Sequence, residues 1–116
     1  MAQVAHSVDG LGRQVDEARR ESLMLFDQAL VRYEDAIAQH ALAERSASVS
    51  REALRLARLA FEAGRRQAIE VADVIAEAAR AADEAARRDA QRWMERDRLL
   101  ATAVLLDQLG VVLPPA

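Results

Sequence analysis

The sequence contains no cysteine, and its only two prolines, Pro114 and Pro115, stand at its end. Aromatic residues make up 3% of the 116 residues, and only four residues are glycine. Because cysteine is absent, disulfides and thiolate metal sites are excluded, and the cellular compartment is left open. This composition argues against a sheet fold and is typical of proteins built from long helices.

Lysine is also absent, so all 16 basic residues are arginine, and they are interleaved with 19 acidic residues. The net charge of −3 and the lack of a basic patch predict that the chain binds no nucleic acid. The longest apolar run, Leu99–Leu106, is about a third of a membrane span, so no direct span is expected. The first ten residues lack the pattern of a signal peptide, and export is not expected from them.

The residues that are abundant are alanine, leucine, glutamate and arginine, all strong helix formers. Gly64 is the one glycine between residues 13 and 109, and glycine readily adopts the left-handed conformation that ends a helix. We therefore predict a single all-α domain over residues 1–116, a long antiparallel two-helix coiled-coil hairpin. Its parts are a helix over about 11–63, a turn near Gly64, a helix over about 67–109, and an apolar, proline-ended tail over 110–116.

The first predicted helix carries a heptad pattern of the kind that forms a coiled-coil seam. One stripe is large or mixed in size: Phe26, Tyr33, His40, Ala47, Leu54 and Phe61. The other is uniformly small: Ser22, Ala29, Ala36, Ala43, Ser50 and Ala57. A further stripe of Leu23, Leu30 and Ile37 widens the apolar face beyond what one neighbouring helix can cover. We therefore expect the hairpin to self-associate into a helical bundle, as a dimer or trimer packed through this further stripe.

For the second helix the pattern predicts a stripe of Ala72, Ala79, Ala86, Trp93 and Leu100, with Ile75 and Ala82 between its members. Folding the chain at Gly64 then sets Trp93 opposite about Ala36, and Leu100 opposite about Ala29. The stripe of Ile75 and Ala82 next meets Asp89, so we expect the seam to shift there.

No catalytic or metal-binding constellation has a workable spacing. His6 and His40 are too few and too far apart for a metal motif, and the chain has no phosphate-binding glycine loop. His40 is interpreted as a tolerated residue of the seam. We expect no enzyme activity, no catalytic residues, no metal and no cofactor.

The predicted turn is rich in charge of both signs. Arg65 and Arg66 follow Gly64, and Glu70 and Asp73 fall on one face of the next helix because they are three residues apart. The simplest interpretation is that these acids complement the dipole at the start of that helix.

The turn also resembles a known family. Phe61-Glu62-Ala63-Gly64 followed by Ile69-Glu70-Val71-Ala72-Asp73 is similar to the periplasmic hairpin tip of TolC-like outer-membrane efflux proteins. The likeness extends from about residue 13 to residue 110, where Leu105–Gly110 resembles the end of the family's second repeat. This resemblance implies one hairpin of a duct in the periplasm and outer membrane, with a structural and protein-interaction role and an adaptor protein's helical hairpin as partner.

By this resemblance, Asp73 corresponds to an acid that narrows the duct entrance, and Arg66 and Glu70 to residues that link helices at the tip. Gly64 marks the turn, and Phe61 stands where the family often has tyrosine. The chain departs from the family in having no strand-like segment and about six additional residues after Gly64. With one hairpin it is expected to be a fragment or a stand-alone relative of one repeat. The alternative is an amphipathic helical coat or adaptor protein, phasin-like or a generic coiled coil.

Overall fold

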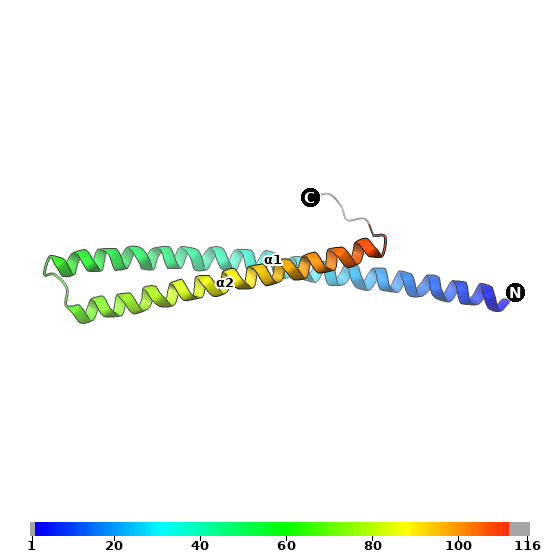
Figure 1. Ribbon diagram of the computed structural model, residues 1–116, viewed down its shortest axis with the longest axis horizontal. Coiled ribbons are helices and arrows are strands. Elements are labelled where there is room, and N and C mark those ends of the chain that lie inside the picture. The colour runs from blue at the N-terminus through cyan, green and yellow to red at the C-terminus, as the bar shows by residue number, and fades with distance from the viewer. Residues whose placement is uncertain (1, 112–116) are drawn as a thin grey trace. The chain divides into compact units, whose positions relative to one another are not determined.

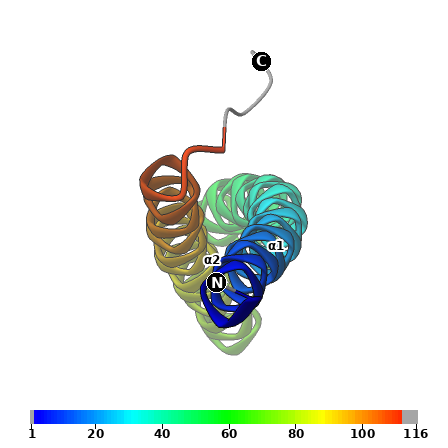
Figure 2. The ribbon, with the colours of Figure 1, turned by 90° about the vertical axis from the view of Figure 1, so that its right-hand side faces the viewer.

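The computed structural model describes residues 2–111, and the side chains of residues 7–111. Within residues 2–111 the chain forms two α-helices and no strand: α1 spans Ala2–Glu62 and α2 spans Ala68–Gln108 (Figure 1). Figure 2 gives an end-on view of the same two helices. The predicted all-α helical hairpin is therefore confirmed. Of the predicted tail over 110–116, residues 112–116 lie outside the described part of the chain.

The turn between the helices is built around Gly64, whose φ is +71°. The amide of Gly64 donates to the carbonyl of Phe61 at 2.9 Å, and the amide of Arg65 donates to that of Ala60 at 2.7 Å. These two bonds form a Schellman motif, in which a left-handed residue directs the chain back to satisfy the last helical carbonyls. The glycine thus ends α1 where the sequence placed the turn.

Gly64→Val is expected to lower the free energy of unfolding by roughly 1–2 kcal/mol, because a β-branched residue is a poor occupant of the left-handed region. Thermal unfolding followed by circular dichroism measures this effect. The matched control is Gly12→Val, since Gly12 is helical and a Cβ there meets nothing within 4 Å. An unchanged melting temperature for Gly64→Val would contradict the account of the turn.

The start of α1 differs from the prediction, which placed it at about residue 11. The helix begins at Ala2 and continues through Gly10 and Gly12. Each of these glycines costs about 1 kcal/mol relative to alanine, but neither removes a backbone hydrogen bond as a proline would. Glycine alone is therefore too weak a stop signal here.

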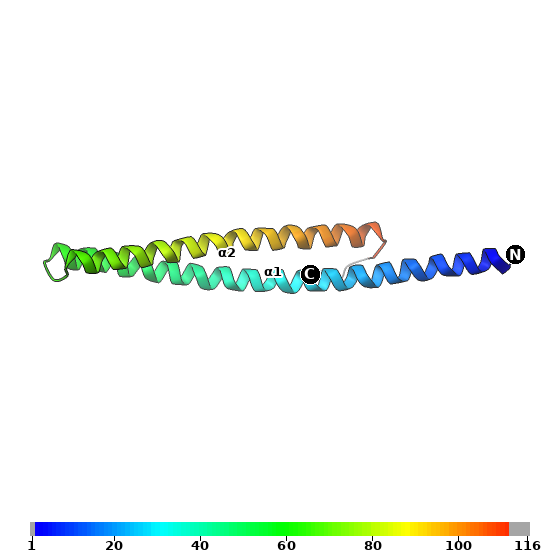
Figure 3. The same ribbon diagram turned by 90° about the horizontal axis from the view of Figure 1, so that it is seen from below.

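The contacts of the two helices fall into two compact units. We call Glu34–Met94 the tip unit, because it contains the turn, and Met1–Tyr33 with Glu95–Ala116 the terminal unit. In the tip unit the two helices lie side by side and run in opposite directions from the turn (Figure 3).

The core of the tip unit consists almost entirely of alanine. Ala47, Ala81 and Ala85 are buried together, with Ala43 packed against them. The predicted seam positions of α1 in this unit are buried or half-buried: Ala36, His40, Ala43, Ala47, Ser50, Leu54 and Ala57. Gln39 and Ala60 beside the seam are half-buried as well. Among the predicted seam positions of this unit Phe61 differs, because it belongs to the last turn before the chain reverses and is 48% exposed.

In the terminal unit the seam carries larger side chains. Its members on α1 are Ser22, Phe26, Ala29 and Tyr33, and those on α2 are Glu95, Leu99, Thr102, Leu106 and Leu109. Leu106 is 0% exposed. The end of α2 is a second Schellman motif, in which Gly110 has a φ of +75° and the amide of Val111 donates to the carbonyl of Leu106. Arg19 Nε donates to the carbonyl of Leu109 at 3.1 Å, which fixes the pairing of the two segments.

The predicted seam of α2 is wrong by one position. Ala72, Ala79, Ala86, Trp93 and Leu100 are exposed, and so are Ile75 and Ala82. The packed stripes are instead Val71, Ala78, Ala85, Arg92, Leu99 and Leu106, with Val74, Ala81, Arg88, Glu95, Thr102 and Leu109. This heptad runs without a break, so the expected shift at Asp89 does not occur.

The alanines of α1 explain why the seam avoids Trp93. Small side chains allow helix axes to approach to about 8 Å, the lower end of the usual range, which leaves no room for an indole ring. In the register set by the alanine core, Ala36 therefore faces Arg92, whose flexible chain can lie along the seam. Trp93 remains 48% exposed, with the guanidinium of Arg92 5.3 Å from its ring centroid. Similarly, within the terminal unit Leu99 takes the place opposite Ala29 that was predicted for Leu100.

In the part of the chain that the structure describes, no helix is long and apolar enough to cross a membrane.

Candidate functional site

The residues singled out at the tip lie around the turn and on the first turns of α2. Arg66 belongs to the connection between the helices, and Glu70 and Asp73 belong to α2. All three side chains are exposed, and within the described residues none of them makes an ion pair or a side-chain hydrogen bond. Glu70 lies in the first turn of α2, where a negative charge interacts favourably with the helix dipole. These charges are free to meet a partner.

Asp73 also borders a shallow groove on one side of the tip unit. The groove has a volume of about 270 Å³ and is lined by Val49, Ser50, Ala53, Asp73, Val74 and Glu77. Its floor is apolar, and both of its charged groups are carboxylates. Glu77 is held by Arg80 of the same helix at 2.9 Å, whereas Asp73 has no such partner among the described residues. The structure therefore combines Asp73 with apolar surface from both helices.

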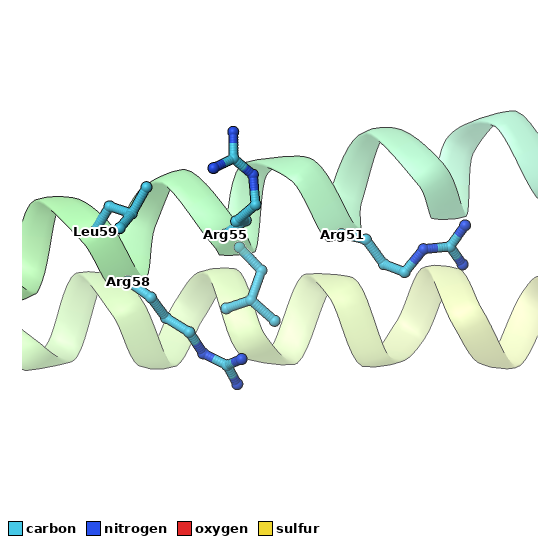
Figure 4. A pocket seen from close by; sticks show the side chains of 5 residues that line it. Arg51, Arg55, Arg58 and Leu59 are labelled. Carbon is cyan, nitrogen blue, oxygen red and sulfur yellow. The ribbon is translucent and has the colours of Figure 1, made fainter.

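A second groove, which the sequence did not indicate, lies along α1 near the tip. It has a volume of about 450 Å³ and is lined by Arg51, Leu54, Arg55, Arg58 and Leu59. In Figure 4, Arg51 and Arg58 point from α1 towards the side on which α2 runs, and Arg55 points the other way. The sequence does contain a signal for this groove. Arg51, Arg55 and Arg58 are separated by four, three and seven residues, and this spacing places the three arginines on one part of the helix surface.

The three arginines of this groove differ in their pairing. Arg55 donates two hydrogen bonds to Glu52, at 2.6 and 3.0 Å. Hydrogen bonding from Arg55 lowers the pKa of the Glu52 carboxyl, and the same bonds raise the pKa of Arg55. Arg51 and Arg58 have no ion-pair partner in the described part of the chain. The groove therefore presents two uncompensated positive charges beside Leu54 and Leu59.

A polar layer interrupts the alanine core of the tip unit. His40 of α1 lies with its Nε2 3.6 Å from a carboxylate oxygen of Asp89 of α2, and equally far from one of Glu44. Arg92 donates to the same oxygen of Asp89 at 2.6 Å, while its buried Nε has no hydrogen-bond partner among the described residues. Of these contacts, only that of His40 with Asp89 joins the two helices, and it favours this register because a slip would separate these two groups. His40 thus lies in the seam as interpreted from the sequence, and it contributes to helix alignment.

Ion pairs elsewhere link residues of the same helix three or four positions apart. The clearest exposed ones are Arg87 with Asp83 at 2.6 Å and Arg80 with Glu77 at 2.9 Å. Such exposed pairs contribute only about 0.3–0.5 kcal/mol each, so they support the helices without defining a site. In the described residues, no group of three histidine, aspartate or glutamate side chains is arranged to hold a metal ion.

The structure therefore offers three candidate features near the turn: the charged tip, the groove bordered by Asp73, and the arginine groove. None of them brings together a nucleophile, a base and a substrate-sized enclosed cavity, and what they share is exposed charge beside apolar surface. Comparisons of the chain with family models, with curated proteins and with solved structures find no match.

Proposed function

We propose that this protein is a structural, protein-interaction module whose helical hairpin completes its core by packing against further helices. The observation that carries the proposal is the large apolar surface left outside the seam. Among the exposed apolar side chains are Leu23, Ile37, Ile75, Trp93 and Leu100, each 37–49% exposed. Leu30 lies between Leu23 and Ile37 in the same heptad position and is half-buried.

The composition of the core supports this proposal. Most of the buried apolar residues are alanines, and Val71 and Leu106 are the only larger ones in the described chain. Each Å² of apolar surface removed from water stabilises the fold by roughly 25 cal/mol. Because alanine has less apolar surface to bury than leucine, a seam of alanines stabilises a hairpin much less than a seam of leucines would. Covering the exposed stripes with further helices would supply the missing apolar contacts.

A finer form of the proposal is that the hairpin acts as part of a duct resembling that of TolC-like efflux or secretion proteins. The support is the sequence resemblance at the tip, together with the exposure of Arg66, Glu70 and Asp73. In this form the tip would contact an adaptor protein's helical hairpin, and the chain would act in the periplasm or at the outer membrane.

A second candidate function, a coat or adaptor for an apolar surface, is favoured by a different stripe. Leu42, Val49 and Leu56 are seven residues apart on α1, and they are 56%, 69% and 53% exposed. Three large apolar side chains at one heptad position form a continuous strip along a helix, which suits adsorption to a surface.

Self-association tests the proposed function. We expect sedimentation equilibrium at low micromolar concentration to show a dimer or trimer. The triple variant Leu23→Ser, Leu30→Ser, Ile37→Ser should be monomeric, because it removes the apolar stripe next to the seam. The control Leu42→Ser, Leu56→Ser, which leaves Val49 in place, should still associate. A wild-type protein that stays monomeric, and that loses binding to an oil–water interface in the control variant, would support the coat function instead.

Replacing Arg66, Glu70 and Asp73 together with alanine is expected to change the free energy of unfolding by no more than about 1 kcal/mol, because exposed charges contribute little to stability. The same variant should bind an adaptor hairpin more weakly, as a pull-down or titration with that hairpin would measure. A loss of several kcal/mol would show that these residues hold the turn together, and the assignment of the tip as a contact site would then be wrong.

A further inference from the structure

The tip unit has two edges of opposite charge. We call Arg51, Arg55 and Arg58 of α1 the basic edge, and Glu70, Asp73 and Glu77 of α2 the acidic edge. Arg51 and Arg58 each follow a seam residue of α1, whereas Glu70 and Glu77 each precede a seam residue of α2. In an antiparallel pair of helices, positions of these two kinds lie on opposite sides of the seam.

The two edges also lie at the same distance from the turn. Two residues are called level when they lie at the same distance from the turn along the hairpin, one on each helix. Burial of Ala43 and Ala47 with Ala81 and Ala85 fixes how the helices pair in this unit. Continued by heptads towards the turn, this register places Glu77 level with Arg51, Asp73 level with Arg55, and Glu70 level with Arg58. Each acid therefore has an arginine at its own level on the opposite edge.

Within the described residues, each edge has one member already paired within its own helix, Arg55 with Glu52 and Glu77 with Arg80, and two members that are not. Arg51 and Arg58 on the basic edge, and Glu70 and Asp73 on the acidic edge, are exposed without an ion pair among the described residues. Each edge also borders an apolar groove, with Leu54 and Leu59 on the basic side and Val49 and Val74 on the acidic side. An apolar floor with charged rims is the usual anatomy of a protein interface.

We propose that copies of this chain pack side by side and parallel, with their tips level, so that the basic edge of one copy contacts the acidic edge of the next. This inference rests on the proposed function, since it names the mode of the self-association described above. Charge complementarity selects the second copy as the occupant, because the three levels match in a parallel arrangement without axial displacement. A two-fold symmetric contact of either edge with itself would bring like charges together, which is unfavourable.

The contact is heterologous, which means that it uses two different surfaces and can be repeated. A rotation that closes produces a ring of hairpins, and one that does not produces a filament. In a ring, every basic edge and every acidic edge is satisfied, and the turn regions lie together at one end.

Charge reversal tests this arrangement in the full chain. The variant Arg51→Glu, Arg58→Glu makes both edges acidic, and Glu70→Arg, Asp73→Arg makes both basic. Each variant alone should raise the dissociation constant for self-association by at least about tenfold, because like charges then face each other. In a mixture, one variant should bind the other with a dissociation constant near that of wild-type self-association, since each supplies the edge that the other lacks.

The matched control for Arg51→Glu, Arg58→Glu is the variant Arg13→Glu, Arg45→Glu. It makes the net charge more negative by the same amount, at arginines outside both edges. This control should associate like the wild type, and circular dichroism should show equal helicity for all variants. If the wild type associates but neither edge variant changes the dissociation constant, the edges are not the interface and the proposed function stands. If the wild type is monomeric at every accessible concentration, both the inference and the proposed function fail.

Cysteine cross-linking tests the orientation, since the chain has no native cysteine. Arg55→Cys and Asp73→Cys place one thiol at the middle of each edge, at the same level. Oxidation of a mixture of the two variants should give a disulfide-linked dimer, whereas each variant alone should stay largely uncrosslinked. Equal cross-linking of Arg55→Cys alone would indicate a two-fold symmetric contact and would overturn the proposal.

Discussion

Leu106→Ala is expected to lower the free energy of unfolding by about 2–5 kcal/mol, the largest effect of any single substitution in this chain. Leu106 is 0% exposed and is the largest fully buried side chain in the described residues. Removing it deletes apolar contacts and leaves a cavity in the seam of the terminal unit. The carbonyl of Leu106 also accepts the hydrogen bond from Val111 that closes α2, so loosening this position should fray the helix end.

Leu105→Ala is the matched control, because it removes the same atoms from the neighbouring position, which is 39% exposed. We expect it to cost less than about 1.5 kcal/mol, in proportion to the smaller area that it buries. Thermal and denaturant unfolding measure the change in the free energy of unfolding that each substitution causes. Amide hydrogen exchange shows which residues lose protection. Protection should fall first within residues 95–109 and 19–33 of the terminal unit. Equal costs for the two substitutions would show that Leu106 does not anchor that unit.

Ala47→Leu is expected to be the second most damaging substitution, at about 1–3 kcal/mol, although it adds apolar volume. Ala47 is 2% exposed and packs against Ala81 and Ala85. A larger side chain there would force the two helices apart and separate the alanines above and below it. The loss of stability should therefore exceed that of a local clash. Close packing of the two helices requires a small residue at every position along the seam.

Ala41→Leu is the control for this prediction, since Ala41 is exposed on the same helix. Leucine and alanine are both good helix formers, so the control should change the melting temperature little. If Ala47→Leu were as stable as the control, the tip unit would tolerate a wider seam. The explanation given above for the exposure of Trp93 would then be wrong.

The sequence by itself determined the hairpin and the face of α1 that forms the seam. Gly64 between two uninterrupted helical tracts predicts the turn, because few other residues accept a φ near +71°. The seam of α1 could be predicted because Ala29, Ala36, Ala43 and Ala57 share one heptad position with little competition from neighbouring positions. Local propensity and periodicity act within one helix, so they can be identified without knowledge of the partner helix.

The face that α2 turns towards α1 was decided only by the tertiary structure. Alanine is so frequent in α2 that the stripe of Ala72 and Ala79 and the stripe of Ala78 and Ala85 are equally plausible from the pattern. The choice depends on interactions between helices: the close approach that excludes Trp93, the burial of Leu106, and the contact of His40 with Asp89. None of these can be inferred from one helix at a time.

The candidate sites divide in the same way. The sequence identified Arg66, Glu70 and Asp73, because charge concentrated at a turn is visible in the chain itself. It did not identify the groove along Arg51 and Arg58, or the matching levels of the two edges, because these depend on how α1 and α2 pair. Helix formation is a local property of the sequence, whereas register and the pairing of charges across a surface arise only when the helices pack.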